Sequence, residues 1–158
     1  MLKYVDTAVT FAEFPNEISL CINISNCNCF CNGCHSPYLS KDIGEILSLE
    51  RLQGLIESNK GITLVGFMGG DSDPKEVNKL AKWVRENYPE LHVGWYSGKQ
   101  ELADSVIDIN NFDFIKLGSY MKQFGPLNNP NTNQKFYKID RNAHTMIWCT
   151  NIFWKEAE

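Results

Sequence analysis

The chain has 158 residues, of which 43% are hydrophobic, and a formal net charge of −4. This length and apolar content suit one globular domain over residues 1–158. The negative charge and the lack of a basic cluster argue against a grip on nucleic-acid phosphates, so we expect protein or small-molecule partners. No apolar run approaches the roughly 18 residues of a membrane span and no signal-peptide core is visible, so we expect a cytoplasmic protein.

Two segments rich in β-branched and aromatic residues, 5–14 and 17–24, flank the turn-prone pair Pro15-Asn16. They predict an N-terminal β-hairpin. In the second segment apolar residues alternate with small or polar ones, so Cys21 shares a face with Asn23 rather than with the isoleucines. We therefore interpret Cys21 as a packed small residue and not as a metal ligand.

The loop over residues 25–40, which follows the hairpin, holds four of the six cysteines within eight residues: Cys27, Cys29, Cys31 and Cys34. Read as Cys-x3-Cys-x2-Cys, the run offers three thiolates to one compact centre. The loop must curl for this, because an extended chain would separate Cys27 and Cys31 by roughly 13 Å. Gly33 and the neighbouring asparagines make such curling feasible. In a reducing compartment, six cysteines indicate a metal rather than disulfides.

Two kinds of metal site remain open from the residues alone. Three thiolates would leave one iron of a cubane iron–sulfur cluster to a ligand that is not protein, because such clusters are normally held by four thiolates. If Cys29 also binds, the four cysteines could instead hold zinc or an electron-transfer cluster. No second Cys-x2-Cys pair follows downstream, which disfavours structural zinc. Plain buried or disulfide-bonded cysteines are the remaining alternative.

The rest of the chain alternates helix and strand patterns. Residues 62–67 form a short apolar run, as expected of a strand covered on both faces, and 91–95 and 112–118 predict two further strands. A helix precedes the first of these, with an apolar stripe made by Leu49, Leu52, Leu55 and Ile56. This order predicts an α/β fold with β/α units.

A second helix is predicted to begin after Asp73, the N-cap, with Pro74 at its first position and Glu76 at the capping-box N3 position. We also expect a short helix at 101–107 and a last strand at 135–139.

The turn Gly69-Gly70-Asp71 lies between the first apolar strand and this helix. Ligands of α/β folds tend to bind where the carboxyl end of a strand meets the amino end of a helix. Two glycines let a backbone approach a ligand closely, and Asp71 could accept a charged hydrogen bond from a ligand ammonium. The alternative is an ordinary glycine-rich turn in which Asp71 is a solvated cap.

The cysteine loop resembles the motif of the radical S-adenosylmethionine (SAM) enzymes. Its ending, Asn32-Gly33-Cys34-His35, is similar to the Gly-Cys-His or Gly-Cys-Tyr ending of the small activating proteins of anaerobic ribonucleotide reductases. Many other radical SAM enzymes carry an aromatic residue where this chain has Gly33. The similarity runs over about residues 4–139. It implies a shortened, open β/α partial barrel of the radical SAM type with an N-terminal β-hairpin.

The resemblance implies that Cys27, Cys31 and Cys34 hold a [4Fe–4S] cluster whose unique iron is chelated by the amino and carboxylate groups of SAM. Beside the cluster ligands, Gly33 and His35 are further candidates for cofactor contact, although His35 could equally close the loop.

Two turns are implied to contact SAM. The Gly69-Gly70-Asp71 turn corresponds to the family's contact with the SAM amino group. Ser97, in the segment Tyr96-Ser97-Gly98, corresponds to a family segment near SAM, although a simple turn would have the same pattern.

In the family, the reduced cluster passes one electron to SAM, which yields methionine and a 5′-deoxyadenosyl radical. That radical takes a hydrogen atom from a glycine Cα of the partner, the glycyl-radical subunit of an anaerobic ribonucleoside-triphosphate reductase. A flavodoxin-type protein is the implied electron donor. The alternatives are an activase of another glycyl-radical enzyme and a non-catalytic zinc or iron–sulfur module.

Residues 118–158 are expected to form a C-terminal loop and tail. Within them, proline and asparagine residues at 124–134 predict an irregular loop. This loop includes Asn133-Gln134, a pair also found in the activating proteins. We interpret this loop as a surface that meets the reductase. Before it, Lys116 near the end of the fourth strand could meet a carboxylate or stay in solvent, as could Asp113 at its start. The apolar tail from His144 to Trp154, with Cys149, is expected to pack against the domain.

Overall fold

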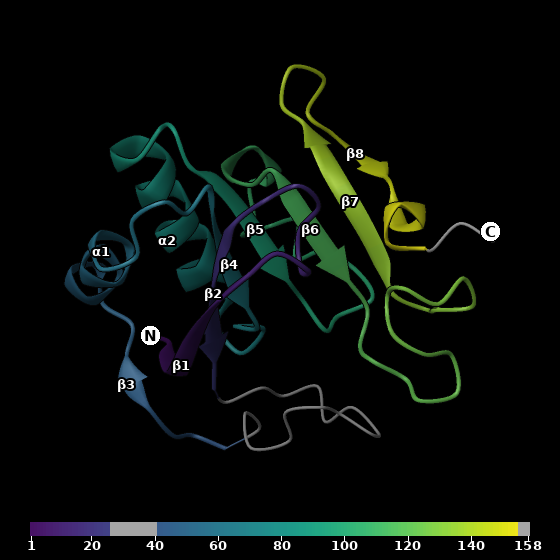
Figure 1. The fold of residues 1–158 in the computed structure, drawn as a ribbon, viewed down its shortest axis with the longest axis horizontal. Coiled ribbons are helices and arrows are strands. Elements are labelled where there is room, and N and C mark those ends of the chain that lie inside the picture. The colour runs from purple at the N-terminus through teal and green to yellow at the C-terminus, as the bar shows by residue number, and fades with distance from the viewer. Residues whose placement is uncertain (26–40, 155–158) are drawn as a thin grey trace.

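The computed structural model describes residues 1–25 and 41–154. It is an α/β fold built on one open, mixed sheet of eight strands in the order β3-β1-β2-β4-β5-β6-β7-β8 (Figure 1). The elements in chain order are β1 (Lys3–Thr10), β2 (Ser19–Ile24), β3 (Glu45–Ile46), α1 (Leu49–Glu57), β4 (Leu64–Met68), α2 (Pro74–Asn87), β5 (His92–Tyr96), the 3₁₀ turn η2 (Ile109–Asn111), β6 (Phe114–Leu117), β7 (Lys135–Asp140), β8 (Thr145–Trp148) and the 3₁₀ turn η3 (Thr150–Phe153). Among these, no helix is both long and apolar enough to cross a membrane.

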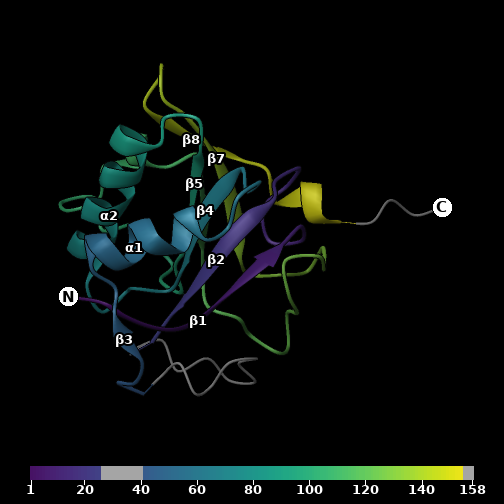
Figure 2. The ribbon, with the colours of Figure 1, turned by 60° about the vertical axis from the view of Figure 1, so that its left-hand side comes forward.

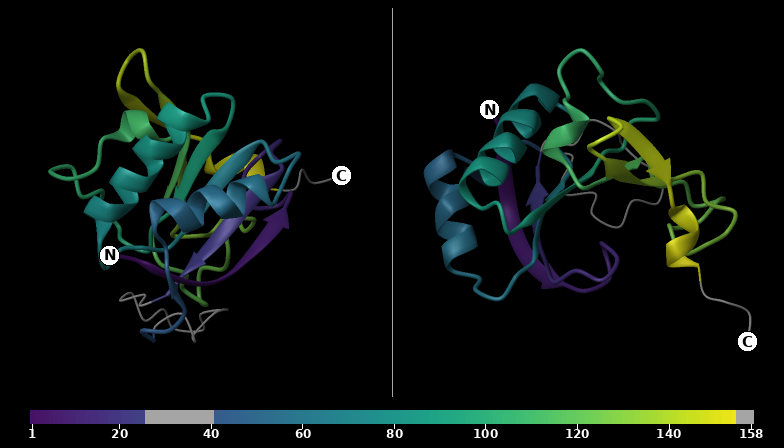
Figure 3. Two further views of the ribbon diagram at one scale, coloured as in Figure 1. Left: turned by 90° about the vertical axis from the view of Figure 1, so that its left-hand side faces the viewer. Right: turned by 90° about the horizontal axis from the view of Figure 1, so that it is seen from above.

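Four neighbouring strands, β2, β4, β5 and β6, are parallel. The strand β1 pairs with β2 in antiparallel fashion, which confirms the predicted N-terminal hairpin. At the other side of the sheet, β7 pairs with β6 and β8 pairs with β7, both in antiparallel fashion. Seen from above, the strands follow an open arc rather than a closed ring (Figure 3). Because parallel strands share a direction, the carboxyl ends of all four meet at one edge of the sheet.

Both helices cover the same face of the sheet (Figure 2). The predicted cap of α2 is confirmed, because Asp73 accepts a hydrogen bond from Glu76 N at 3.3 Å. At the start of α1, Ser48 accepts one from Arg51 N at 3.1 Å, a cap that was not predicted. The capping box is only half formed, because Asp73 N donates to Gly70 O at 3.0 Å. Each helix buries one apolar stripe, which packs against the strand side chains that point toward the helices. This main core includes Leu20, Ile22, Ile24, Leu52, Ile56, Val65, Phe67, Val77, Leu80, Val84, Trp95 and Ile115.

The opposite, helix-free face is filled in its middle by Phe14, which the turn between β1 and β2 folds back over the sheet. The ring packs directly on two neighbouring glycines: a Cβ at Gly94 would lie within 3 Å of three Phe14 ring carbons, and one at Gly66 would lie 2.7 Å from another. Phe114 and Phe136 surround the ring at centroid distances of 6.1 Å. This second cluster is the apolar floor of the helix-free face.

Cys21 belongs to this second cluster, as the alternation of β2 predicted. Its side chain is buried, and burial raises the pKa of the thiol to about 12, with a smaller contribution from the Glu13 carboxylate. A thiol that stays protonated at neutral pH is a packing residue, which agrees with its interpretation from sequence.

One prediction about an irregular segment is corrected by the structure. Residues 101–107 do not form a helix: Val106 N and Ile107 N both donate to Ala103 O, so the segment makes a single turn. So short a segment gains little from helix formation, and its apolar side chains reach the core from the turn. The short strands β3 and β8, which form the two edges, were not expected.

The apolar tail packs down only in part. Phe153 contacts Phe136 edge-on at 4.8 Å between ring centroids, and Cys149 is half-buried against the same cluster. In contrast, Ile147, Trp148 and Ile152 are about half exposed.

The close packing of Phe14 on the glycines predicts a strong asymmetry between two glycine substitutions. We expect Gly94→Ala to lower the free energy of unfolding by about 1–3 kcal/mol, because the methyl group would overlap a buried ring. Gly54→Ala, on the exposed side of α1 with nothing within 4 Å, should raise it by about 0.5–1 kcal/mol. Urea denaturation of both variants measures this difference, and an unchanged Gly94→Ala protein would contradict the packing of Phe14.

Candidate functional site

The carboxyl edge of the four parallel strands brings together the turns that the sequence singled out. Gly69 N donates to Tyr96 O at 3.0 Å, and the Trp95 indole N–H donates to Gly69 O at 2.7 Å. In the next pair of strands, Ser97 N donates to Lys116 O at 2.8 Å. The turns after β4, β5 and β6 are therefore tied to one another along this edge.

The two glycines of the first turn have backbone conformations that favour glycine, with φ of 112° at Gly69 and 99° at Gly70. Both positions are also crowded: a Cβ at Gly69 would lie 3.2 Å from Ile24 O, and one at Gly70 would lie 2.5 Å from Val77 Cγ2. These contacts with β2 and α2 account for both glycines. The turn is thus held tightly between the end of β2 and the start of α2.

Asp71 joins the turns after β4 and β5. Its carboxylate accepts hydrogen bonds from the Ser97 hydroxyl at 2.5 Å and from Gly98 N at 2.8 Å. The Ser97 hydroxyl in turn accepts a hydrogen bond from Lys99 N at 3.1 Å. Two residues that the sequence assigned separately to a ligand therefore touch.

A polar row crosses the helix-free face next to this edge. The register pairs Asn23 with Met68, Met68 with Tyr96, and Tyr96 with Lys116, so that the four side chains share one face. At one end of the row, the Asn23 amide donates to the Asp6 carboxylate at 2.7 Å. The row lies one step closer to the carboxyl edge than Phe14 and its glycines. The helix-free face is therefore apolar in its middle and polar toward the edge.

Lys116 is buried within this row, not exposed at a strand end. Its ammonium donates to Ser97 O at 3.1 Å and to Gly118 O at 2.9 Å, and it lies 5.2 Å from the centroid of the Tyr96 ring. A buried ammonium is costly unless it is well hydrogen-bonded, and these two carbonyl oxygens supply such bonds. Asp113, by contrast, is structural: Arg85, Arg141 and Val93 N all donate to its carboxylate.

Asn23 and Tyr96 are the site residues that sequence reasoning missed. The strand alternation already separated Asn23 from the isoleucines of β2, which was the available signal. For Tyr96, only the register with Lys116 reveals its place.

The cluster loop lies outside the described residues, and with it Cys27, Cys31, Gly33, Cys34 and His35. The same holds for Cys29. The flanks of the loop are described. The Ser25 hydroxyl lies 3.2 Å from Lys3 O and 2.5 Å from Ile43 O, so both flanks are anchored beside β1 at the carboxyl end of β2. Within residues 1–25 and 41–154, no group of three or more His, Cys, Asp or Glu side chains could hold a metal.

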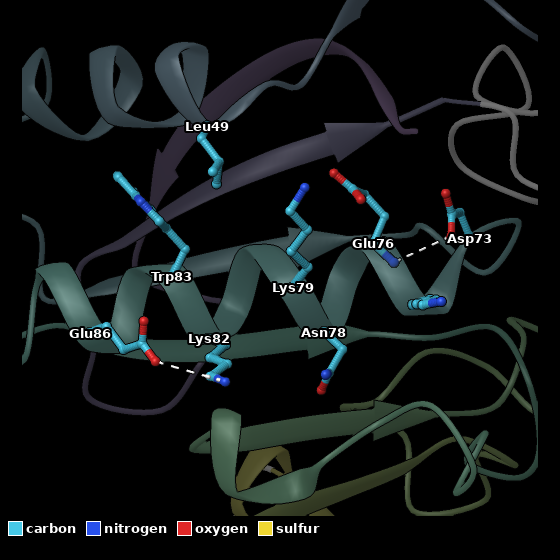
Figure 4. A pocket seen from close by; sticks show the side chains of 9 residues that line it. Leu49, Asp73, Glu76, Asn78, Lys79, Lys82, Trp83 and Glu86 are labelled. Carbon is cyan, nitrogen blue, oxygen red and sulfur yellow. Dashed lines mark hydrogen bonds and ion pairs between the residues drawn. The ribbon is translucent and has the colours of Figure 1, made fainter.

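A pocket of about 720 Å³ lies between α1 and α2, on the helix-covered face of the sheet (Figure 4). Leu49 stands across it from Trp83, and α2 lines it with lysines and carboxylates, of which Lys82 and Glu86 pair at 4.0 Å. These charges belong to a solvated helix surface. The pocket lies on the helix-covered side and is lined mainly by the solvated outer surface of α2, with the N-cap Asp73 at one end, so we do not take it as the functional site.

Comparisons of the chain with family models, with curated proteins and with solved structures find no match. A functional proposal therefore rests on the motifs and the geometry described above.

The contact between Asp71 and Ser97 can be tested by a double-mutant cycle. We expect Asp71→Ala and Ser97→Ala each to lower the free energy of unfolding by about 1–3 kcal/mol, and the two effects to be coupled by about 0.5–3 kcal/mol because they break one network. Chemical denaturation of the two single variants and the double variant gives the coupling. The exposed Asp104→Ala is the control and should be near neutral. Strictly additive effects would contradict a direct contact.

Proposed function

We propose that this protein is a radical SAM activase that installs a glycyl radical on an anaerobic ribonucleotide reductase. The observation that carries the proposal is one of placement. The Cys27-x3-Cys31-x2-Cys34 loop follows β2 directly, and the carboxyl end of β2 packs against the Gly69-Gly70 turn. In the sequence, the three-cysteine motif therefore begins directly after the strand end against which the glycine-rich turn packs.

The fold is compatible with this proposal. We infer that the open α/β sheet is a shortened partial barrel of the radical SAM type. Two features support this inference: β4 and β5 are joined through α2 in a β/α order, and the helices cover one face while the other is left for a ligand. An open sheet does not enclose its substrate. That suits an enzyme whose substrate is another protein.

The groups implied by the motif are a [4Fe–4S] cluster and SAM. When bound, they would supply the chemistry of a 5′-deoxyadenosyl radical, formed together with methionine by one-electron reduction of SAM and able to take a hydrogen atom from a glycine Cα. Cys27, Cys31 and Cys34 would hold the cluster. Because only three thiolates come from the motif, one iron is left for the amino and carboxylate groups of SAM.

The described residues fit SAM by charge. Asp71 presents a carboxylate suited to a ligand ammonium, and Ser97 holds that carboxylate in place. The buried ammonium of Lys116 stands in the adjoining polar row and suits a ligand carboxylate. Gly33, His35, Gly69 and Gly70 complete the proposed cofactor contacts.

The chain also protects a reactive species from water. Phe14 and its aromatic neighbours close the middle of the helix-free face, so that a ligand bound over the polar row would be bordered on its inner side by an apolar cluster. Exclusion of water and other quenchers is the protein's main task when the cofactor performs the chemistry. The reductant would be a flavodoxin-type protein.

The proposal is tested on protein purified and reconstituted with iron and sulfide without oxygen. After reduction with dithionite and addition of SAM, we expect four irons per chain and the formation of 5′-deoxyadenosine and methionine. Replacing Cys27, Cys31 or Cys34 with Ala should abolish both, because each removes one of three required thiolates. Asp71→Ala should keep the iron and raise the KM for SAM about tenfold or more.

Cys29→Ala separates the proposal from a non-catalytic module. We expect this variant to keep its cluster and to cleave SAM, since Cys29 is not one of the three proposed cluster ligands. Loss of the metal in Cys29→Ala, or zinc bound by all four thiolates, would identify a four-cysteine module. Intact SAM in the reduced, iron-loaded wild type would also overturn the proposal.

A further inference from the structure

A second pocket opens on the helix-free face beside the polar row. It has a volume of about 340 Å³, within the usual range of binding pockets. Four separate parts of the chain form it: the turn between β1 and β2, the end of β5, the loop after β6, and η3. The lining residues are Ala12, Glu13, Tyr96, Tyr120, Pro126, Leu127, Asn128, Gln134 and Phe153.

Among the residues that the structure describes, Glu13 is the only charged one in the lining of this pocket. None of the ion pairs among residues 1–25 and 41–154 involves it. Its main-chain oxygen accepts a hydrogen bond from the Tyr96 hydroxyl, which anchors this residue over the face. Burial raises the pKa of Tyr96, and the Glu13 carboxylate adds to that effect, so the carboxylate lies near the phenol. The pocket is therefore negative and otherwise neutral.

The pocket adjoins the candidate site. Tyr96 belongs both to its lining and to the polar row, where it is the register neighbour of Lys116. Gln134 forms a second link, because its side-chain amide donates to Gly118 O, which also accepts a hydrogen bond from the Lys116 ammonium. An occupant of the pocket would thus lie next to any ligand held at the carboxyl edge.

We propose that this pocket receives an extended segment of the protein substrate and that Glu13 pairs with a lysine or arginine side chain close to the reacting glycine. This inference rests on the proposed function, which requires a protein segment to reach the site. The aromatic rings and Leu127 can pack on aliphatic side chains. The Asn128 and Gln134 amides are suited to main-chain groups. The single carboxylate sets the preference for a cation.

The test measures the binding of synthetic octapeptides to the full chain. Each peptide has one central glycine, alanine and serine elsewhere, and a single lysine, norleucine or glutamate two or three residues from the glycine. Isothermal titration in the absence of SAM makes the readout independent of catalysis. We expect the lysine peptides to bind wild-type protein about tenfold more tightly than the norleucine peptides, and the glutamate peptides to bind more weakly still.

Two variants locate the charge that is recognised. Glu13→Gln should bind the lysine and norleucine peptides equally, and Glu13→Lys should prefer the glutamate peptides. The matched control is Glu90→Gln, an exposed carboxylate away from the pocket, which should behave as wild type. A lysine preference that survives Glu13→Gln, or wild-type protein that binds all three peptides alike, would overturn the inference.

These outcomes are distinguishable from failure of the proposed function. Wild-type protein that cleaves SAM but shows no preference for lysine peptides disproves the role of Glu13 and leaves the activase intact. Protein that prefers lysine peptides through Glu13 but leaves SAM intact has a cationic-peptide site and a different function.

Discussion

Parallel pairing of β2, β4, β5 and β6 is the constraint on which the site depends. It aligns four strand ends at one edge and sets Asn23, Met68, Tyr96 and Lys116 in a single row. The hydrogen bonds between the turns follow from that alignment. Each turn begins directly after the paired residues at the end of its strand, so turns that follow neighbouring strands lie side by side. A shift of one residue in any of these strands would turn the row over to the helix side.

The division of the two faces follows from the same pairing. Alternate residues of each strand meet either the helices or Phe14, so the sheet has two cores of different character. The larger core stabilises the domain. The smaller core is placed where a ligand would need a dry floor, and it requires glycine at positions 66 and 94 to admit the Phe14 ring. Packing and proposed function thus depend on the same few residues.

Much of this arrangement could be predicted from the sequence because it is encoded locally. The Asp73-Pro74 start of α2, the alternation in β2 and the apolar run of β4 each carry a clear signal in a few neighbouring residues. The Asp71 to Ser97 contact could not be predicted, because it depends on which strands become neighbours. The burial of Lys116 was missed for the same reason. Segment 101–107 carried a helical composition, but its tertiary contacts favoured a single turn.

Hydrogen–deuterium exchange of the iron-loaded protein with and without SAM tests the central claim most directly. If the carboxyl edge of the sheet is the ligand site, SAM should slow exchange in segments 69–71, 97–99 and 116–118 and leave α1 unchanged. Protection confined to α1 and α2, around the pocket between the helices, would contradict the assignment of the site.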